Sequence, residues 1–274
     1  MISPAGVPMR IAVAVKQVPE TRAVRFDEAT GTVVRDGVES IVNPLDLYAV
    51  ETAVRLCAEC GGESVAFSMG PAKAGEALRE ALSMGIDQAV LMSDRVFAGS
   101  DTWATAYVLA EAIRRHGPFD LIVCGERATD GDTGQVGPEV AASLEWPVVT
   151  YVNHIEAAEN GFVRLTRRVE TGTERLLVKT PALMTVVKET GEPRLPTLRG
   201  KQRARAAQIP TLSQRELALD TAKLGLGGSP TRVAKVFRPK VTRECERLQV
   251  RDEPAVDAAS ARFAEFLAER NLLP

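Results

Sequence analysis

The chain has 274 residues, of which 45% are hydrophobic and 26% are charged, so it can bury a core beneath an ordinary polar surface. Its 34 basic residues nearly balance 36 acidic ones, which argues against nucleic acid as the main partner because phosphate binding needs a basic face. No apolar run reaches the ~18–20 residues that cross a bilayer. Four cysteines in a chain of this length do not form a disulfide framework.

Residues 1–8 lack the basic and apolar regions of a secretory signal. We expect a short disordered lead-in there, and a cytoplasmic protein that is not itself embedded in a membrane.

Short apolar runs alternate with helical patterns through the first half of the chain, which predicts right-handed crossovers and a parallel sheet covered on both faces. The fold class is therefore α/β, a flavodoxin-like or nucleotide-binding domain over residues 9–188. Strands are expected at 10–15, 64–68, 89–92, 121–124 and 148–152. Helices are expected at 72–84, 102–115, 135–144 and after Pro44, where Asn43 is the predicted N-cap. Residues 24–42 suggest a small hairpin with its turn at 29–31.

The pattern changes after about residue 155. Two apolar segments, 162–169 and 175–178, suggest an antiparallel hairpin, and 181–188 reads as one more strand. Proline, glycine and basic residues predict an exposed, extended segment over 189–205. The remainder shows no clear period until an amphipathic helix at 255–270. We expect residues 189–274 to form a partner-recognition loop and an extended C-terminal arm that lies on a partner.

The most informative loop follows the strand at 121–124 and opens a helix: Gly131-Asp-Thr-Gly-Gln-Val-Gly-Pro138. Free N–H groups and the positive end of a helix dipole make such a position a phosphate site. A capped turn with Asp132 as N-cap is the alternative. The loop lacks the Gly-Lys-Ser/Thr of nucleotide triphosphatases. A second helix opens at Gly99-Ser-Asp-Thr102, as another set of donors or as a cap at Ser100 or Asp101.

Other patterns in the sequence carry less information about function. Cys57 and Cys60 have redox or metal spacing but sit within a predicted helix, and only two histidines, His116 and His154, are present, so we expect no zinc site and no catalytic triad. Lys16 and Arg95 fit either a phosphate or flavin contact or a plain surface charge. The basic run 201–205 has no interleaved aromatics, which favours a partner-facing arm over nucleic acid.

Five motifs in order resemble the β subunit of electron-transfer flavoproteins. They are Val15-Lys-Gln-Val-Pro19, Asn43-Pro44, Gly70-Pro-Ala72, the 131–138 loop and Glu192-Pro-Arg-Leu-Pro-Thr-Leu198. The segment 93–105 and Asp130-Gly-Asp-Thr133 resemble the bifurcating branch of that family, whose β subunit holds FAD.

The resemblance implies an obligate heterodimer with an α subunit, and a buried nucleotide in this chain. The implied cofactor-binding residues are Ala14, Lys16, Asn43, Met69, Asp94, Arg95, Ser100, Asp101, Thr102, Cys124, Asp130, Asp132, Thr133, Gly134, Gln135 and Val136. The implied partner-binding residues are Glu192, Pro193, Arg194 and Leu198, with Leu198 as the exposed anchor on an acyl-CoA dehydrogenase-type partner.

The favoured function is electron transfer by a protein that is not a stand-alone enzyme: FAD bound here takes a hydride from NADH, and electrons pass to the α-subunit flavin and to a low-potential acceptor such as ferredoxin or flavodoxin. Two alternatives stay open. One is a plain shuttle with structural AMP in this subunit. The other, of a different class, is a nucleotide-binding module of the universal-stress type.

Overall fold

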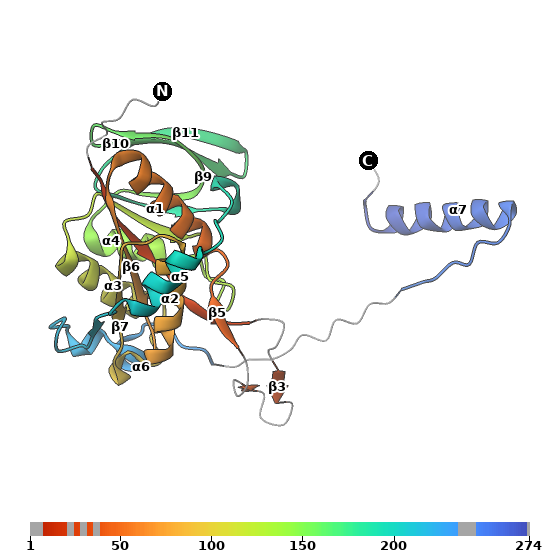
Figure 1. Cartoon of the computed structure of the whole chain (residues 1–274). Helices are drawn as coiled ribbons and strands as arrows, with labels where there is room; N and C mark the ends of the chain where they lie inside the picture. Colours follow the sequence, from red (N-terminus) through yellow and green to blue (C-terminus); the bar gives the residue numbers. More distant parts are fainter. Residues whose placement is uncertain (1–7, 21–24, 28–31, 35–38, 235–244, 273–274) are drawn as a thin grey trace. The chain divides into compact units, whose positions relative to one another are not determined.

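The computed structural model describes residues 8–20, 25–27, 32–34, 39–234 and 245–272, with the backbone alone for 25–27 and 32–34. Contacts divide the chain into two compact units, Met1–Ala234 and Lys235–Pro274. The first unit carries the sheet and the helices that cover it (Figure 1).

The first unit is built on a mostly parallel sheet, as the sequence predicts. Among the described residues nine strands form it, in the order β11-β10-β9-β12-β8-β1-β6-β7-β13. All neighbours from β9 to β13 are parallel, and β10 and β11 extend the β9 edge as antiparallel strands. The bounds are β1 Arg10–Ala14, β6 Glu63–Met69, β7 Gln88–Met92, β8 Leu121–Gly125, β9 Val148–Glu159, β10 Phe162–Val169, β11 Gly172–Lys179, β12 Ala182–Val186 and β13 Thr211–Leu212.

Helices cover both faces of this sheet (Figure 1). Helices α1 (Asp46–Cys60) and α2 (Gly75–Met84) pack on one face, with Ile11 and Val13 of β1 beneath them. Helices α3 (Thr102–His116) and α4 (Val136–Leu144) pack on the other, over Ala12 of the same strand. Side chains of a strand alternate between its faces, so an apolar run without alternation is the signature of a strand buried on both sides. Cys57 and Cys60 are buried free thiols on α1.

The strand order identifies the type of α/β sheet. The first four parallel strands along the chain are β1, β6, β7 and β8, and in space they run β7-β6-β1-β8. This 3-2-1-4 order is that of a doubly wound nucleotide-binding sheet, whereas the flavodoxin order begins 2-1-3. The order reverses between β1 and β8, and ligands of such sheets bind at that switch point, beyond the carboxyl ends of the strands.

Two small antiparallel pairs lie in the stretch where one hairpin was expected. β3 (Arg25–Asp27) pairs with β4 (Thr32–Val34), while β5 (Ser40–Val42) pairs with β2 (Gln17–Pro19). The predicted turn at 29–31 falls outside the described residues. The residues that follow β1 therefore form a short strand of their own, β2.

The segment 189–205 is not wholly extended, contrary to the prediction. After the short 3₁₀ turn η4 (Lys188–Thr190), helix α5 spans Leu198–Ala206, with Thr197 as its N-cap. Arg203 donates to Leu82 O and Ile86 O at the end of α2, and Arg79 of α2 donates to Ala204 O at the end of α5. Each arginine thus donates to carbonyl groups in or just beyond the last turn of the facing helix. These long-range bonds make a helix where composition suggested none.

Residues 206–234 also belong to the first unit. β13 adds to the sheet beside β7, and η5 (Thr221–Lys223) and α6 (Gly225–Gly228) follow. Leu217, Leu219 and Leu224 are buried in the same core as α3.

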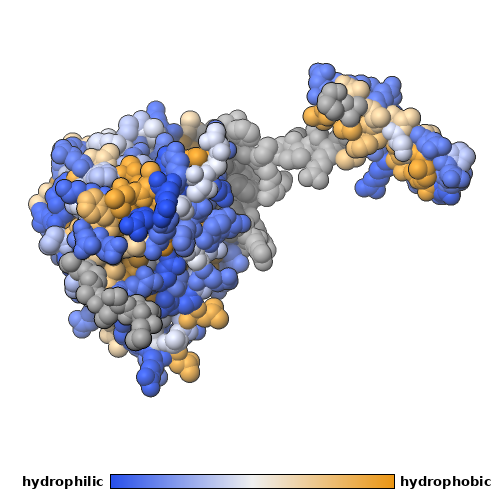
Figure 2. Space-filling view, turned by 90° about the horizontal axis from the view of Figure 1, so that it is seen from above, coloured by the Kyte–Doolittle hydropathy of each residue, from blue (hydrophilic) through white to orange (hydrophobic). Residues whose placement is uncertain are grey.

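The second unit contains the predicted C-terminal helix, α7 (Glu253–Glu269), which Asp252 caps. None of its residues is buried. Val256, Phe263 and Phe266 are exposed apolar side chains on it, and Figure 2 shows hydrophobic and hydrophilic atoms side by side on this helix.

Candidate functional site

A cavity of about 360 Å³ lies at the switch point of the sheet. Its wall comes from the end of β1, the loop after β8 with the first turn of α4, and the start of α3. The volume is at the lower end of the ~300–1,000 Å³ that ligand pockets occupy. Most of the predicted cofactor-binding residues line it: Ala14, Lys16, Met69, Ser100, Asp101, Thr102, Cys124, Asp132, Thr133, Gly134, Gln135 and Val136.

The loop after β8 presents backbone donors to this cavity. Gln135 is the N-cap of α4, and no side chain caps the helix. The alternative interpretation of a plain turn made Asp132 that cap, but Asp132 has φ 54° and its carboxylate pairs with the Arg127 Nε at 3.1 Å. Gly134 has φ 64°, a left-handed conformation that favours glycine. The first N–H groups of α4 are thereby left for an anion, as a phosphate site requires.

Asn43 holds this loop in place instead of capping α1. Its Nδ2 donates to Arg127 O at 2.9 Å, and its Oδ1 accepts from Thr129 N at 3.2 Å. The residue is fully buried. Helix α1 begins at Asp46, after Leu45, and has no side-chain cap. The predicted N-cap role is therefore wrong, because the amide finds donor and acceptor together across the chain, 84 residues away.

Lys16 and Asp130 join the two walls of the cavity. Lys16 Nζ lies 2.7 Å from Asp130 Oδ1, and both side chains are partly exposed. Asp130 itself is not among the lining residues, whereas Lys16 is. Since exposed ion pairs contribute little to stability, this pair matters because it holds the side chain of Lys16, a residue of the cavity wall, in one position.

Asp46 lies in the cavity wall and was not expected there. Its Oδ2 accepts from Lys16 N at 2.7 Å. Burial raises the pKa of this carboxyl to about 7, and hydrogen bonds from Lys16 N and from Asn43 offset only part of that rise. Burial, helped by the Asp46 charge, also raises the pKa of the Cys124 thiol to about 12, so Cys124 is no thiolate nucleophile at neutral pH. The acidic residue of Asn43-Pro-Leu-Asp46 was the signal available in the sequence.

The start of α3 is not a second phosphate site of the same kind. Asp101 is its N-cap and accepts from Ala104 N at 3.0 Å, which confirms the predicted cap. Thr102 Oγ1 donates to Glu139 Oε1 at 3.1 Å. The other carboxylate oxygen of Glu139 is buried with no hydrogen-bond partner among the described residues. Burial, with the Asp101 charge, raises the pKa of Glu139. Of these two acidic residues only Asp101 lines the cavity, and an acidic residue at this wall suits hydroxyl or amide donors of a ligand better than a phosphate.

Asp94 and Arg95 lie outside the cavity lining. Asp94 caps the short 3₁₀ turn η3 (Arg95–Phe97) through Val96 N, and its other oxygen accepts from Gln214 N. Arg95 is exposed on that turn. The structure therefore gives Asp94 a role in holding the chain near β13, and it does not bring Arg95 to the cavity.

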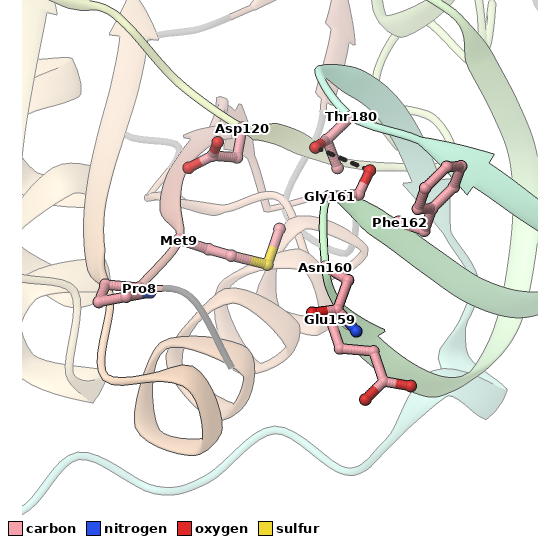
Figure 3. Close-up of a pocket in the computed structure, with 9 residues that line it drawn as sticks. Pro8, Met9, Asp120, Glu159, Asn160, Gly161, Phe162 and Thr180 are labelled. Atoms are coloured by element: carbon pink, nitrogen blue, oxygen red, sulfur yellow. Dashed lines mark hydrogen bonds between the residues drawn. The ribbon is translucent and has the colours of Figure 1, made fainter. Parts of the chain in front are cut away.

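A smaller cavity of about 90 Å³ opens at the amino ends of β1, β8 and β12 (Figure 3). Pro8, Asp120 and Thr180 precede these strands, and Thr180 Oγ1 donates to Gly161 O at 3.2 Å. The space is too small for a nucleotide, and it lies at the opposite ends of the strands from the large cavity.

The predicted partner-recognition residues lie on the first unit, where an ion pair ties Arg194 to Glu51 of α1. Arg194 donates to Glu51 from its backbone N, Nε and Nη2, at 3.0, 2.7 and 2.8 Å. Partial burial raises the pKa of Glu51, but the hydrogen bonds and charge of Arg194 outweigh it and hold that pKa below its ordinary value. Arg194 is thus used within the chain. Leu198 is 82% exposed and Leu195 is 87% exposed.

Comparison with known proteins agrees with this architecture. The electron transfer flavoprotein domain matches residues 30–217. An electron transfer flavoprotein subunit beta from Thermoanaerobacterium thermosaccharolyticum is 45% identical over 239 residues, covering 87% of this chain and 91% of its relative. The chain belongs to the electron transfer flavoprotein family, as a beta subunit.

Two further relatives of this electron transfer flavoprotein subunit carry other names. The caffeyl-CoA reductase-Etf complex subunit CarD from Acetobacterium woodii is 43% identical over 232 residues, covering 84% of this chain and 88% of the relative. Protein FixA from Azotobacter vinelandii is 38% identical over 268 residues and covers 95% of both chains. The family performs flavin-associated electron transfer, pairs with an alpha subunit and works with dehydrogenase-type partners. Among the described residues, no helix combines the length and hydrophobicity needed to cross a membrane.

Proposed function

We propose that this beta subunit binds FAD in the large cavity and receives electrons from NADH in the cytoplasm. The observation that carries the proposal is one continuous cavity between two different helix starts. The α4 side offers free N–H groups for phosphate, and the α3 side offers the polar residues Ser100, Asp101 and Thr102. Flavin and ribityl groups of FAD supply uncharged donors for the second side, beyond its phosphates.

Each wall has a defined task in this proposal. The backbone of Thr133, Gly134 and Val136 binds phosphate, while Lys16 adds positive charge. When bound, FAD would supply the redox chemistry, taking a hydride from NADH and releasing electrons singly toward the alpha-subunit flavin and a low-potential acceptor such as ferredoxin or flavodoxin. The chain positions and tunes that chemistry. The name of one relative, the caffeyl-CoA reductase-Etf complex subunit CarD, supports work in a complex with a reductase.

Cofactor content tests the proposal. Acid release of cofactors from the purified heterodimer should give two flavins, and anaerobic NADH should bleach one of them. Thr102→Val removes the hydroxyl at the α3 start and should reduce this bleaching. Arg95→Ala, outside the cavity, should leave it unchanged. One flavin, one AMP and no response to NADH would overturn the proposal.

The second candidate function is an electron shuttle with structural AMP in this subunit. It predicts one flavin and one AMP for each heterodimer. A specific observation favours it: a volume of about 360 Å³ is close to the small limit of ligand pockets. Family membership argues against the universal-stress-type alternative, which carries no redox role.

We further propose that α7 packs on the alpha subunit. Its apolar side chains Val256, Phe263 and Phe266 are all exposed, and exposed apolar faces mark interaction sites. The chain expressed alone should aggregate, and co-expression with the alpha subunit should prevent this. A stable monomer on sizing chromatography, with α7 protected from hydrogen exchange, would count against this partner surface.

A further inference from the structure

Residues 225–231, which we call the strap, pack on the loop that leads into α3. Gly225 has φ 59°, and a Cβ there would lie 2.3 Å from Val96 O. Leu226 N donates to Ala98 O at 3.1 Å. This end of the strap therefore depends on a glycine that lets two backbones approach closely.

Asp101 fastens the other end of the strap. Thr231 donates to Asp101 Oδ2 from its backbone N at 2.9 Å and from Oγ1 at 2.7 Å. Asp101 N donates in turn to Ser229 Oγ at 2.8 Å, and that hydroxyl donates to Gly225 O. Three residues after Thr231 the first compact unit ends, at Ala234. The strap is thus the last anchored part of the chain before the second unit.

The same Asp101 is part of the cavity wall. Its carboxylate accepts hydrogen bonds from Ala104 N on one oxygen and from Thr231 on the other, which stabilise its negative charge. Partial burial raises the Asp101 pKa, but these hydrogen bonds outweigh it and lower that pKa overall. If the strap leaves, Oδ2 loses both its donors, and an uncompensated negative charge then faces the cavity. A nucleotide carries negative charge, so it binds more weakly to such a wall.

We propose that nucleotide binding in the cavity and attachment of the strap are coupled through Asp101, which acts as a positioning residue. The inference rests on the proposed function, in that the ligand is an adenine nucleotide. By thermodynamic reciprocity, a bound nucleotide must hold the strap down as strongly as the strap favours the nucleotide. The cavity thereby influences how firmly the chain is anchored just before residues 235–274.

The experiment uses the nucleotide-depleted heterodimer and two probes, AMP and FAD. Hydrogen exchange of residues 225–234 should slow when either probe binds the wild type. Thr231→Val removes one of the two donors of an exposed residue and should preserve the fold. It should weaken AMP binding about five- to tenfold, at the lower end of typical coupling factors, and reduce the protection of the strap by AMP. Gly225→Ala, which disturbs the opposite end, should act in the same direction.

Thr221→Val is the matched control. Thr221 is exposed on η5, and its side chain makes no hydrogen bond to another described residue. The AMP affinity of this variant should equal that of the wild type. Strap exchange that ignores nucleotide in the wild type, or equal AMP affinity in Thr231→Val and Thr221→Val, overturns the coupling alone. A wild-type heterodimer that binds neither AMP nor FAD overturns the proposed function, and the coupling with it.

Discussion

At the scale of single residues, Asp46 makes a pH-dependent contribution to folding. Its pKa rises from 3.8 to about 7 through burial. Between these two pH values the Asp46 carboxyl is therefore protonated in the folded state and ionised in the unfolded chain. The resulting stability is fully present below pH 4 and is lost as pH rises through 7, by up to ~4 kcal/mol. In Asp46→Asn this slope should flatten. Urea unfolding of the heterodimer at several pH values between 4.5 and 7.5 measures it, and parallel profiles for both proteins would contradict the assignment.

Gly134 tests the phosphate loop at the same scale. Its φ of 64° is one that β-branched residues avoid, and its position faces the cavity. Gly134→Val should remove the bound nucleotide. Gly161→Val is the matched control, because Gly161 has φ 78° in the turn before β10, remote from the large cavity. Both variants should lose comparable stability through strain, but only the first should lose nucleotide in an acid-release assay. Full nucleotide content in Gly134→Val would reduce the loop to a plain turn.

At the scale of elements, the sequence predicts the strands and helix caps that a local pattern of residues determines. Buried strands such as β1 and β8 and the cap of α3 by Asp101 follow from apolar runs and an acidic residue before a helix. Asn43 and Asp132 follow the same capping rule and yet do not cap. Asn43 finds partners across the chain at Arg127 and Thr129, and Asp132 pairs with Arg127 within its own folded loop. Such partners depend on the fold, so the order of residues alone does not reveal them.

Helix α5 is the clearest element that composition could not predict, and it carries a test. Arg203 Nη2 donates to Leu82 O and Ile86 O at 2.8 and 2.9 Å, and hydrogen bonds from charged donors contribute ~1.5–3 kcal/mol. Arg203→Ala should therefore speed hydrogen exchange across residues 198–206. Arg199→Ala, on the same helix with an exposed side chain, should leave exchange near the wild-type rate. Equal hydrogen-exchange rates in both variants would mean that the two hydrogen bonds of Arg203 do not stabilise α5.

At the scale of the whole molecule, electron transfer needs a partner, and the edge bearing Leu198 is the proposed place for it. The Arg194–Glu51 pair on one side and α5 on the other hold this edge rigid, so an exposed leucine there binds without much ordering cost. Leu198→Ala should slow electron exchange with an acyl-CoA dehydrogenase-type partner roughly tenfold, as expected for an interface hot spot, while cofactor content stays the same. Leu177→Ala on β11, with 62% exposure, is the control and should exchange electrons normally. Stopped-flow kinetics at limiting partner make the measurement, and identical rates for Leu198→Ala and the wild type would remove Leu198 from the docking surface.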